Sequence, residues 1–225
     1  MKRIYPLFAV LAVVLLVANF VAGLSIGDFN AVAARKRESL AELAKLKRRI
    51  GVDPALVEAA EAKAREADQE LAAPRRRMTI HMLLGSTATL VVVLVNSVAI
   101  TYFIGTSRWC REVVEAYGLA PELAEQMAAL KRRTFRWALL GILTMLLVIG
   151  LGAAADPSGS NYENSAKLVT PHYVAAMVSI VVVAFAFWMQ WLVIQENFVV
   201  LDEVMGGVRK ARAERGLPTE ASSAN

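Results

Sequence analysis

The sequence predicts an all-α, polytopic membrane protein with four transmembrane helices, an outer helical hairpin and cytoplasmic helical extensions. The chain is 56% hydrophobic, with a mean hydropathy of +0.46, which is more apolar than an average soluble domain. A helix needs about 20 apolar residues to cross a hydrocarbon core. Four stretches of about this length contain no Asp, Glu, Lys or Arg: Ile4–Leu24, Met78–Ile104, Trp137–Ala155 and Tyr173–Ile194.

Residues 1–24 form the first predicted transmembrane helix. Met1, Lys2 and Arg3 precede the apolar run, as in a secretory signal peptide. The apolar core of a signal peptide has about 7–15 residues, so the longer run here predicts an uncleaved signal anchor. The alternative is cleavage near Val21-Ala22-Gly23. Either interpretation places the N-terminus in the cytoplasm and the next segment outside.

Residues 25–77 are predicted to form the extracytoplasmic helical hairpin. The first helix is expected over residues 31–50, and Gly51-Val52 separates it from a second helix that Asp53 caps and Pro54 begins. The pattern predicts that this second helix ends at Pro74. It carries a narrow apolar stripe, which favours docking onto another subunit or a second copy; a solvated hairpin without a partner is the alternative. The stripe consists of Leu56, Ala60, Ala64, Ala67 and Leu71.

The remaining segments alternate between apolar spans and helical connections. Gly118 is expected to end one helix, Pro121-Glu122 to begin the next, and Gly216 with Pro218 to stop the last before a disordered tail over 219–225. The predicted order is transmembrane helix 2 (78–104), a cytoplasmic helical hairpin (105–136), transmembrane helix 3 (137–155), a short outer loop (156–172), transmembrane helix 4 (173–195) and a cytoplasmic extension with the tail (196–225).

The distribution of Lys and Arg predicts that both termini are cytoplasmic. Twelve of these residues flank the spans on the proposed inner side, whereas the short outer loop carries only Lys167. Residues 25–77 hold twelve more and oppose this orientation, but the segment is long and also contains nine acidic residues. The Ala-, Val- and Arg-rich composition suggests a bacterium, and therefore the bacterial inner membrane.

His81 and His172 are the only histidines, and this threading places both near the outer ends of their spans. Two imidazoles at matched depth in a helical bundle can ligate a b-type haem or a metal ion. Gly85, Ser86, Ala88, Ala175 and Ala176 would leave room for a macrocycle, and Met82 and Met177 are soft ligands that suit copper. The alternative is that each histidine anchors or caps its helix at the membrane interface.

Asn96 and Gln190 form a second polar pair, at comparable depth in the second and fourth spans. Amide hydrogen bonds between membrane helices contribute roughly 0.6–2 kcal/mol, so these residues are expected to fix the register of the bundle. A lining for a substrate is the alternative. The single cysteine, Cys110, excludes an internal disulfide.

No catalytic motif is present, and no charged residue lies inside a span, as ion-coupled transport generally requires. The basic clusters lack interleaved aromatic residues, which argues against nucleic-acid binding. We therefore expect a non-catalytic protein in contact with membrane lipid, an accessory or scaffolding subunit that binds other membrane subunits or itself. A bis-histidine b-type haem protein that transfers electrons through His81 and His172 is the alternative, and a small transporter or channel ranks third.

Overall fold

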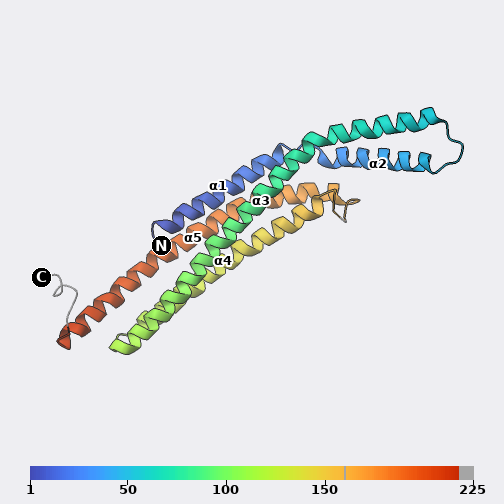
Figure 1. The fold of residues 1–225 in the computed structure, drawn as a ribbon. Helices are drawn as coiled ribbons and strands as arrows, with labels where there is room; N and C mark the ends of the chain where they lie inside the picture. Colours follow the sequence, from blue (N-terminus) through green and yellow to red (C-terminus); the bar gives the residue numbers. More distant parts are fainter. Residues whose placement is uncertain (160, 218–225) are drawn as a thin grey trace. The chain divides into compact units, whose positions relative to one another are not determined.

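The computed structural model describes residues 1–159 and 161–217, which form five helices and no strand. Four of the helices are long and apolar enough to cross a membrane, as the sequence predicts. The predicted tail over residues 219–225 lies outside the described residues. The helices, shown in Figure 1, are α1 (Ile4–Leu24), α2 (Phe29–Lys47), α3 (Pro54–Tyr117), α4 (Glu122–Ala155) and α5 (Ser165–Glu214).

The ends of the helices follow local capping chemistry. The carboxylate of Asp53 accepts a hydrogen bond of 2.9 Å from the backbone N–H of Ala55, and α3 begins between these residues. Gly118 and Gly216 follow the ends of α3 and α5, and both have a φ of +64°, which a glycine adopts without the steric cost of a Cβ. These boundaries agree with the predicted ones.

The prediction that a helix ends at Pro74 is wrong, because α3 continues through this residue for 64 residues in total. Proline removes one backbone hydrogen bond from a helix interior and costs about 3 kcal/mol. The turns on either side of Pro74 are held by packing, since Leu71 is buried and His81 contacts α1. A break at the start of an apolar segment would also leave several backbone groups without partners.

Helix α5 also begins earlier than the fourth span, at Ser165, and it contains Pro171. His172 therefore lies on the helix rather than in the loop predicted to extend to it. The connection between α4 and α5 is correspondingly shorter than expected, since α4 ends at Ala155.

Two compact units make up the chain, and α1, α3, α4 and α5 contribute residues to both. The first unit contains Met1–Ala12, Leu90–Thr144 and the residues from Val181 onward. Its core is formed by one face of each helix, where apolar residues recur every three or four positions. On α3 this face consists of Val92, Val95, Asn96, Ala99 and Phe103, all of them buried.

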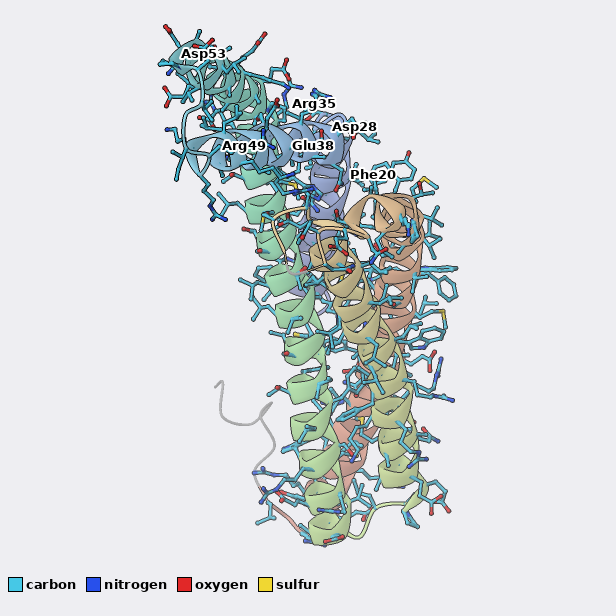
Figure 2. All side chains as sticks on the ribbon, turned by 90° about the vertical axis from the view of Figure 1, so that its right-hand side faces the viewer. Phe20, Asp28, Arg35, Glu38, Arg49 and Asp53 are labelled. Atoms are coloured by element: carbon cyan, nitrogen blue, oxygen red, sulfur yellow. The ribbon has the colours of Figure 1, made fainter. Side chains whose placement is uncertain are left out.

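The second unit contains Val13–Thr89 and Met145–Ile180. Within it, α2 lies antiparallel to the first part of α3 (Figure 1), and ion pairs join the two helices along their length. In Figure 2, Asp28 lies at the start of α2, Arg49 lies just after its end, and Asp53 lies at the start of α3. The pairs are Arg35–Glu70 (3.2 Å), Lys36–Asp68, Lys47–Glu61 (2.7 Å) and Lys63–Glu42 (2.9 Å).

Four of the five residues in the apolar stripe of this segment are covered inside the chain. Ala60, Ala64, Ala67 and Leu71 are each no more than 8% exposed, on the part of α3 that packs against α2. Alanine allows two helix backbones to approach closely, so a narrow stripe is sufficient for this pair. Most of the surface that motivated the expectation of an external partner is therefore covered by α2, whereas Leu56 is 56% exposed.

The beginning of α2 is also tied to the connection between α4 and α5. Asn30 donates to the carbonyl of Ala155 at 3.4 Å and accepts from the hydroxyl of Ser165 at 2.6 Å. Arg37 donates to the carbonyl of Pro157 at 2.9 Å. These bonds attach α2 to the far end of α4 and the start of α5, within the same unit.

Candidate functional site

The structure brings the two predicted histidines together. His81 projects from α3 and His172 from α5, and the centres of their rings are 6.2 Å apart with the ring planes at 76°. Both rings are half-buried, within the second unit. This pairing agrees with the matched depth that the sequence predicted.

His81 is anchored to α1. Its Nδ1 lies 3.1 Å from the backbone carbonyl oxygen of Asn19, and because a carbonyl oxygen can only accept, Nδ1 is the protonated nitrogen. The ring can approach α1 because residue 23 is a glycine, where a Cβ would lie 3.1 Å from Cε1 of His81. Gly23 follows Asn19 by one helical turn, so the carbonyl and the open space belong to the same face of α1.

His172 is held against α4 in a similar way. A Cβ on Gly152 would lie 3.4 Å from Nδ1 of His172 and 2.9 Å from its Cε1, and the second distance is closer than side chains pack. The backbone of Val148, one turn before Gly152, interacts with His172. No hydrogen bond of acceptable geometry reaches Nδ1, which is buried.

The two histidines are held in the same pattern. Each imidazole rests on a neighbouring helix at a glycine, Gly23 or Gly152, that lies four positions after a residue whose backbone contacts the histidine. In both cases the glycine lies against the Cε1–Nδ1 edge of the ring. No hydrogen bond to Nε2 of either histidine is found among the described residues, and His81 with a protonated Nδ1 has its lone pair on Nε2. The arrangement can offer two imidazole nitrogens to a ligand.

Asn19 completes the polar cluster, and the sequence analysis missed it. Its amide packs on α3 at Gly85, where a Cβ would lie 3.1 Å from Nδ2, and its Oδ1 is buried without a hydrogen-bond partner. The space expected at Gly85 is therefore filled by this amide. The available signal was a lone polar residue one turn before a glycine in an otherwise apolar span.

The two methionines proposed as soft ligands are exposed. Met82 is 53% exposed and Met177 is 43% exposed, so both thioethers face outward from their helices. Ser86 is also exposed, whereas Ala88 is buried. The described residues contain no cluster of three or more His, Cys, Asp or Glu side chains that could hold a metal ion.

The second predicted pair also meets, in the first unit. Gln190 of α5 donates to Oδ1 of Asn96 on α3 at 2.9 Å, and Nδ2 of Asn96 donates to the carbonyl of Val92 at 2.9 Å. Gly141 of α4 makes room for the amide, since a Cβ there would lie 3.1 Å from Nδ2 of Asn96. Both amides are fully buried, and together they link three helices.

A further polar contact in this unit had no counterpart in the sequence analysis. Asn197, two turns after Gln190 on α5, donates to the hydroxyl of Tyr102 at 2.8 Å. Asn197 is fully buried although it lies beyond the predicted fourth span. The only sequence signal is its spacing from Gln190, which places both residues on one face of α5.

Comparison of the chain with family models, with curated proteins and with solved structures found no match. The candidate site is therefore defined by its own geometry. It consists of His81, His172 and Asn19 on three helices, with Gly23 and Gly152 as the surfaces on which the rings rest.

Proposed function

We propose that this chain is a b-type haem protein of the membrane, in which His81 and His172 would hold one haem and the haem would supply electron transfer. The observation that carries the proposal is the pairing of these two rings across α3 and α5, with no hydrogen bond to Nε2 of either ring from the residues that the structure describes. In an apolar helical bundle, an imidazole without a partner for its acceptor nitrogen is costly. His81 has the lone pair on Nε2, and a shared metal centre would satisfy it.

The separation of the rings supports one shared iron. A ligating imidazole nitrogen lies about 2 Å from its metal, so two rings on opposite sides of one ion have centres roughly 6 Å apart. The centres of His81 and His172 are 6.2 Å apart. Rotation of a ring about its nitrogen–metal axis does not change that distance, so ring planes at 76° are compatible with axial ligation.

The contact between Nδ1 of His81 and the carbonyl of Asn19 also supports ligation. A metal-bound histidine usually donates its other ring N–H to a carbonyl or carboxylate, which fixes the tautomer and raises the basicity of the ligating nitrogen. The backbone of Val148 interacts with His172, whose ring also rests on Gly152 of the same helix. Both rings are thus held by helices other than their own.

A haem also needs space for its macrocycle beside the two rings. The amide of Asn19 fills the space at Gly85, and the half-exposed Met82 and Met177 supply no further ligand. A haem therefore requires space elsewhere around the ring pair, whereas a single transition-metal ion would require almost none. A visible absorption spectrum together with a measurement of bound metal distinguishes a haem from a single metal ion.

We further propose that both termini are cytoplasmic in a bacterial inner membrane, so that the histidine pair lies near the outer face. The excess of Lys and Arg at the short inner flanks supports this orientation. The bonds from Asn30 and Arg37 to residues 155–165 support placing α2 and the α4–α5 connection on the same side of the membrane. The accessory-subunit hypothesis now lacks the alanine stripe as its surface. An electron-transfer protein nevertheless needs a donor and an acceptor as partners.

The test is a visible absorption spectrum of the full chain, purified in mild detergent from cells with ample haem, before and after reduction with dithionite. We expect a Soret band that shifts on reduction and sharp α and β bands. His81→Ala and His172→Ala should each abolish these bands, and Ser86→Ala, an exposed neighbour on α3, should leave them unchanged. His172→Met should retain haem with an altered spectrum, because methionine also ligates haem iron.

Three results would overturn the haem assignment. A flat spectrum together with one equivalent of a transition metal, lost in both histidine variants, would replace haem by a single ion. A flat spectrum without bound metal would leave the pair as a packing contact. Retention of all bands in both alanine variants would place any haem elsewhere.

A further inference from the structure

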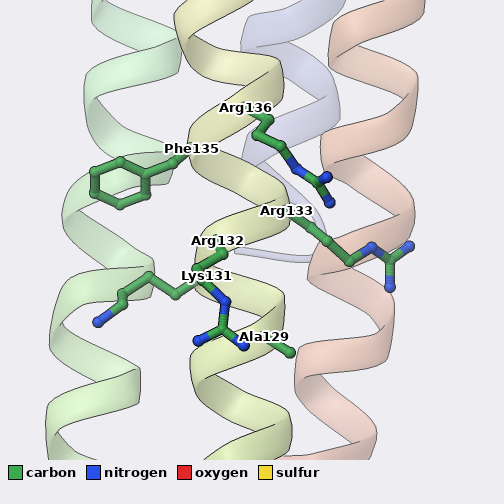
Figure 3. Close-up of a pocket in the computed structure, with 6 residues that line it drawn as sticks. All are labelled: Ala129, Lys131, Arg132, Arg133, Phe135 and Arg136. Atoms are coloured by element: carbon green, nitrogen blue, oxygen red, sulfur yellow. The ribbon is translucent and has the colours of Figure 1, made fainter.

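A cluster of basic residues lies on α4 immediately before its apolar stretch. Lys131, Arg132, Arg133 and Arg136 fall within two helical turns, and the charge-free run begins at Trp137. Together with Ala129 and Phe135 they line a concavity of about 670 Å³ in the first unit. Figure 3 shows Lys131 and Phe135 on one side of α4, and Arg133 and Arg136 on another.

Only one of these cations is neutralised. Arg133 forms a bidentate ion pair with Glu196 of α5, in which Nη2 lies 3.1 Å from Oε1. Lys131, Arg132 and Arg136 have no carboxylate within ion-pair distance in the described part of the chain. We name these three residues the cationic turn.

The spacing within the cationic turn is unfavourable for the chain alone. Arg132 and Arg136 are four positions apart and therefore lie on the same face of the helix. Like charges at this spacing destabilise a helix by a few tenths of a kcal/mol. An anion between the two guanidinium groups would replace this repulsion with two charge-assisted hydrogen bonds.

We propose that the cationic turn binds the phosphate headgroup of an anionic membrane lipid. Its position just before the apolar stretch corresponds to the headgroup region, where anionic lipids concentrate and basic pockets bind them. The guanidinium fork matches the geometry of a phosphate, and Phe135, which is 39% exposed, supplies an apolar contact for the lipid chains. The proposal is independent of the histidine pair, which belongs to the second unit.

The test is native mass spectrometry of the full chain in detergent, titrated with phosphatidylglycerol or with phosphatidylcholine. We expect phosphatidylglycerol to remain bound at activation energies that remove phosphatidylcholine. The double variant Arg132→Gln/Arg136→Gln should weaken binding of phosphatidylglycerol about 30-fold, since each basic residue near an anionic surface contributes about a factor of five. Arg132→Lys/Arg136→Lys should retain most of the affinity.

The matched control is Arg209→Gln/Lys210→Gln, which removes the same charge from an exposed turn of α5 in the same unit. This control should change the affinity for phosphatidylglycerol by less than about twofold. Arg209 and Lys210 lie several helical turns beyond the apolar stretch that ends at Ile194, whereas Arg136 lies next to the stretch that begins at Trp137. An equal loss in both double variants would mean that net charge, and not the cationic turn, determines binding. Displacement of the lipid by excess inorganic phosphate would identify a site for free anions and overturn the lipid assignment, as would equal binding of both lipids.

Discussion

Replacing Gly152 with alanine tests the packing of the histidine site most directly. The new Cβ would lie 2.9 Å from Cε1 of His172, so the ring or the helix has to move. Overpacking of this kind costs typically 1–3 kcal/mol. Alanine also favours the helix over glycine by about 0.8–1 kcal/mol, which partly offsets the clash. We expect a net destabilisation of up to about 2 kcal/mol for Gly152→Ala.

Gly150 provides the control on the same helix. A Cβ at this position meets no atom within 4 Å, so Gly150→Ala has the helix-propensity gain without the clash. The difference between the two variants should therefore be about 1–3 kcal/mol, measured as the free energy of unfolding in an SDS titration followed by circular dichroism.

A double-mutant cycle identifies the ring as the cause. In a His172→Ala background the clash is removed, and Gly152→Ala should then be neutral or slightly stabilising, which gives a coupling energy of about 1–3 kcal/mol. If Gly152→Ala is as stable as Gly150→Ala, or is equally harmful with and without the imidazole, then His172 does not rest on α4 as described and the argument for its orientation fails.

Three further outcomes follow from other contacts. Asn96→Leu and Gln190→Leu should each destabilise the chain by about 1–3 kcal/mol in SDS titrations, while the double variant costs less than their sum because it leaves neither amide unpaired; additive losses would contradict the bond. The hydrogen bond from Lys36 holds the pKa of the Asp68 carboxyl below its usual value of 3.8. The ion pair therefore stabilises the α2–α3 contact fully at pH values above 3.8, and this stabilisation is lost as the pH falls through the lowered pKa. The rate of amide hydrogen exchange in α2 should therefore rise in acid. Asp68→Asn should remove the part of this rise that comes from protonation of Asp68. Burial raises the pKa of the Cys110 thiol, so maleimide should label it slowly at neutral pH until the protein is denatured; fast labelling of the native protein would place it on the surface.

The features that the sequence predicted correctly depend on short-range rules. The apolar run Ile4–Leu24 coincides with α1, and the run that ends at Ala155 coincides with the end of α4. The length of a charge-free run can be counted along the sequence. The helix stop at Gly118 and the helix cap at Asp53 are likewise recognised from neighbouring residues. None of these signals requires knowledge of how the helices pack.

The features that the sequence did not predict depend on helix rotation and on tertiary support. The matched depth of His81 and His172 followed from counting residues, but the role of Gly152 depends on which face of α4 meets α5. Pro74 was expected to end a helix because propensity alone disfavours it, and packing on both sides overrides that preference. The alanine stripe was expected to face a partner, because its own antiparallel neighbour, α2, could not be oriented from periodicity.

The anchoring of His81 also bears on whether α1 is retained. Cleavage at Val21-Ala22-Gly23 would remove Asn19, and with it the carbonyl that fixes the tautomer of His81. It would also remove Tyr5, which is 2% exposed in the first unit and covers part of that core. If His81 is a ligand oriented by Asn19, the protein in the membrane must keep α1, and mass spectrometry of the purified protein should find peptides from residues 4–24. A mature chain that lacks α1 and still shows the haem bands would mean that His81 binds without this anchor, and the glycine–carbonyl pattern would then be a feature of packing alone.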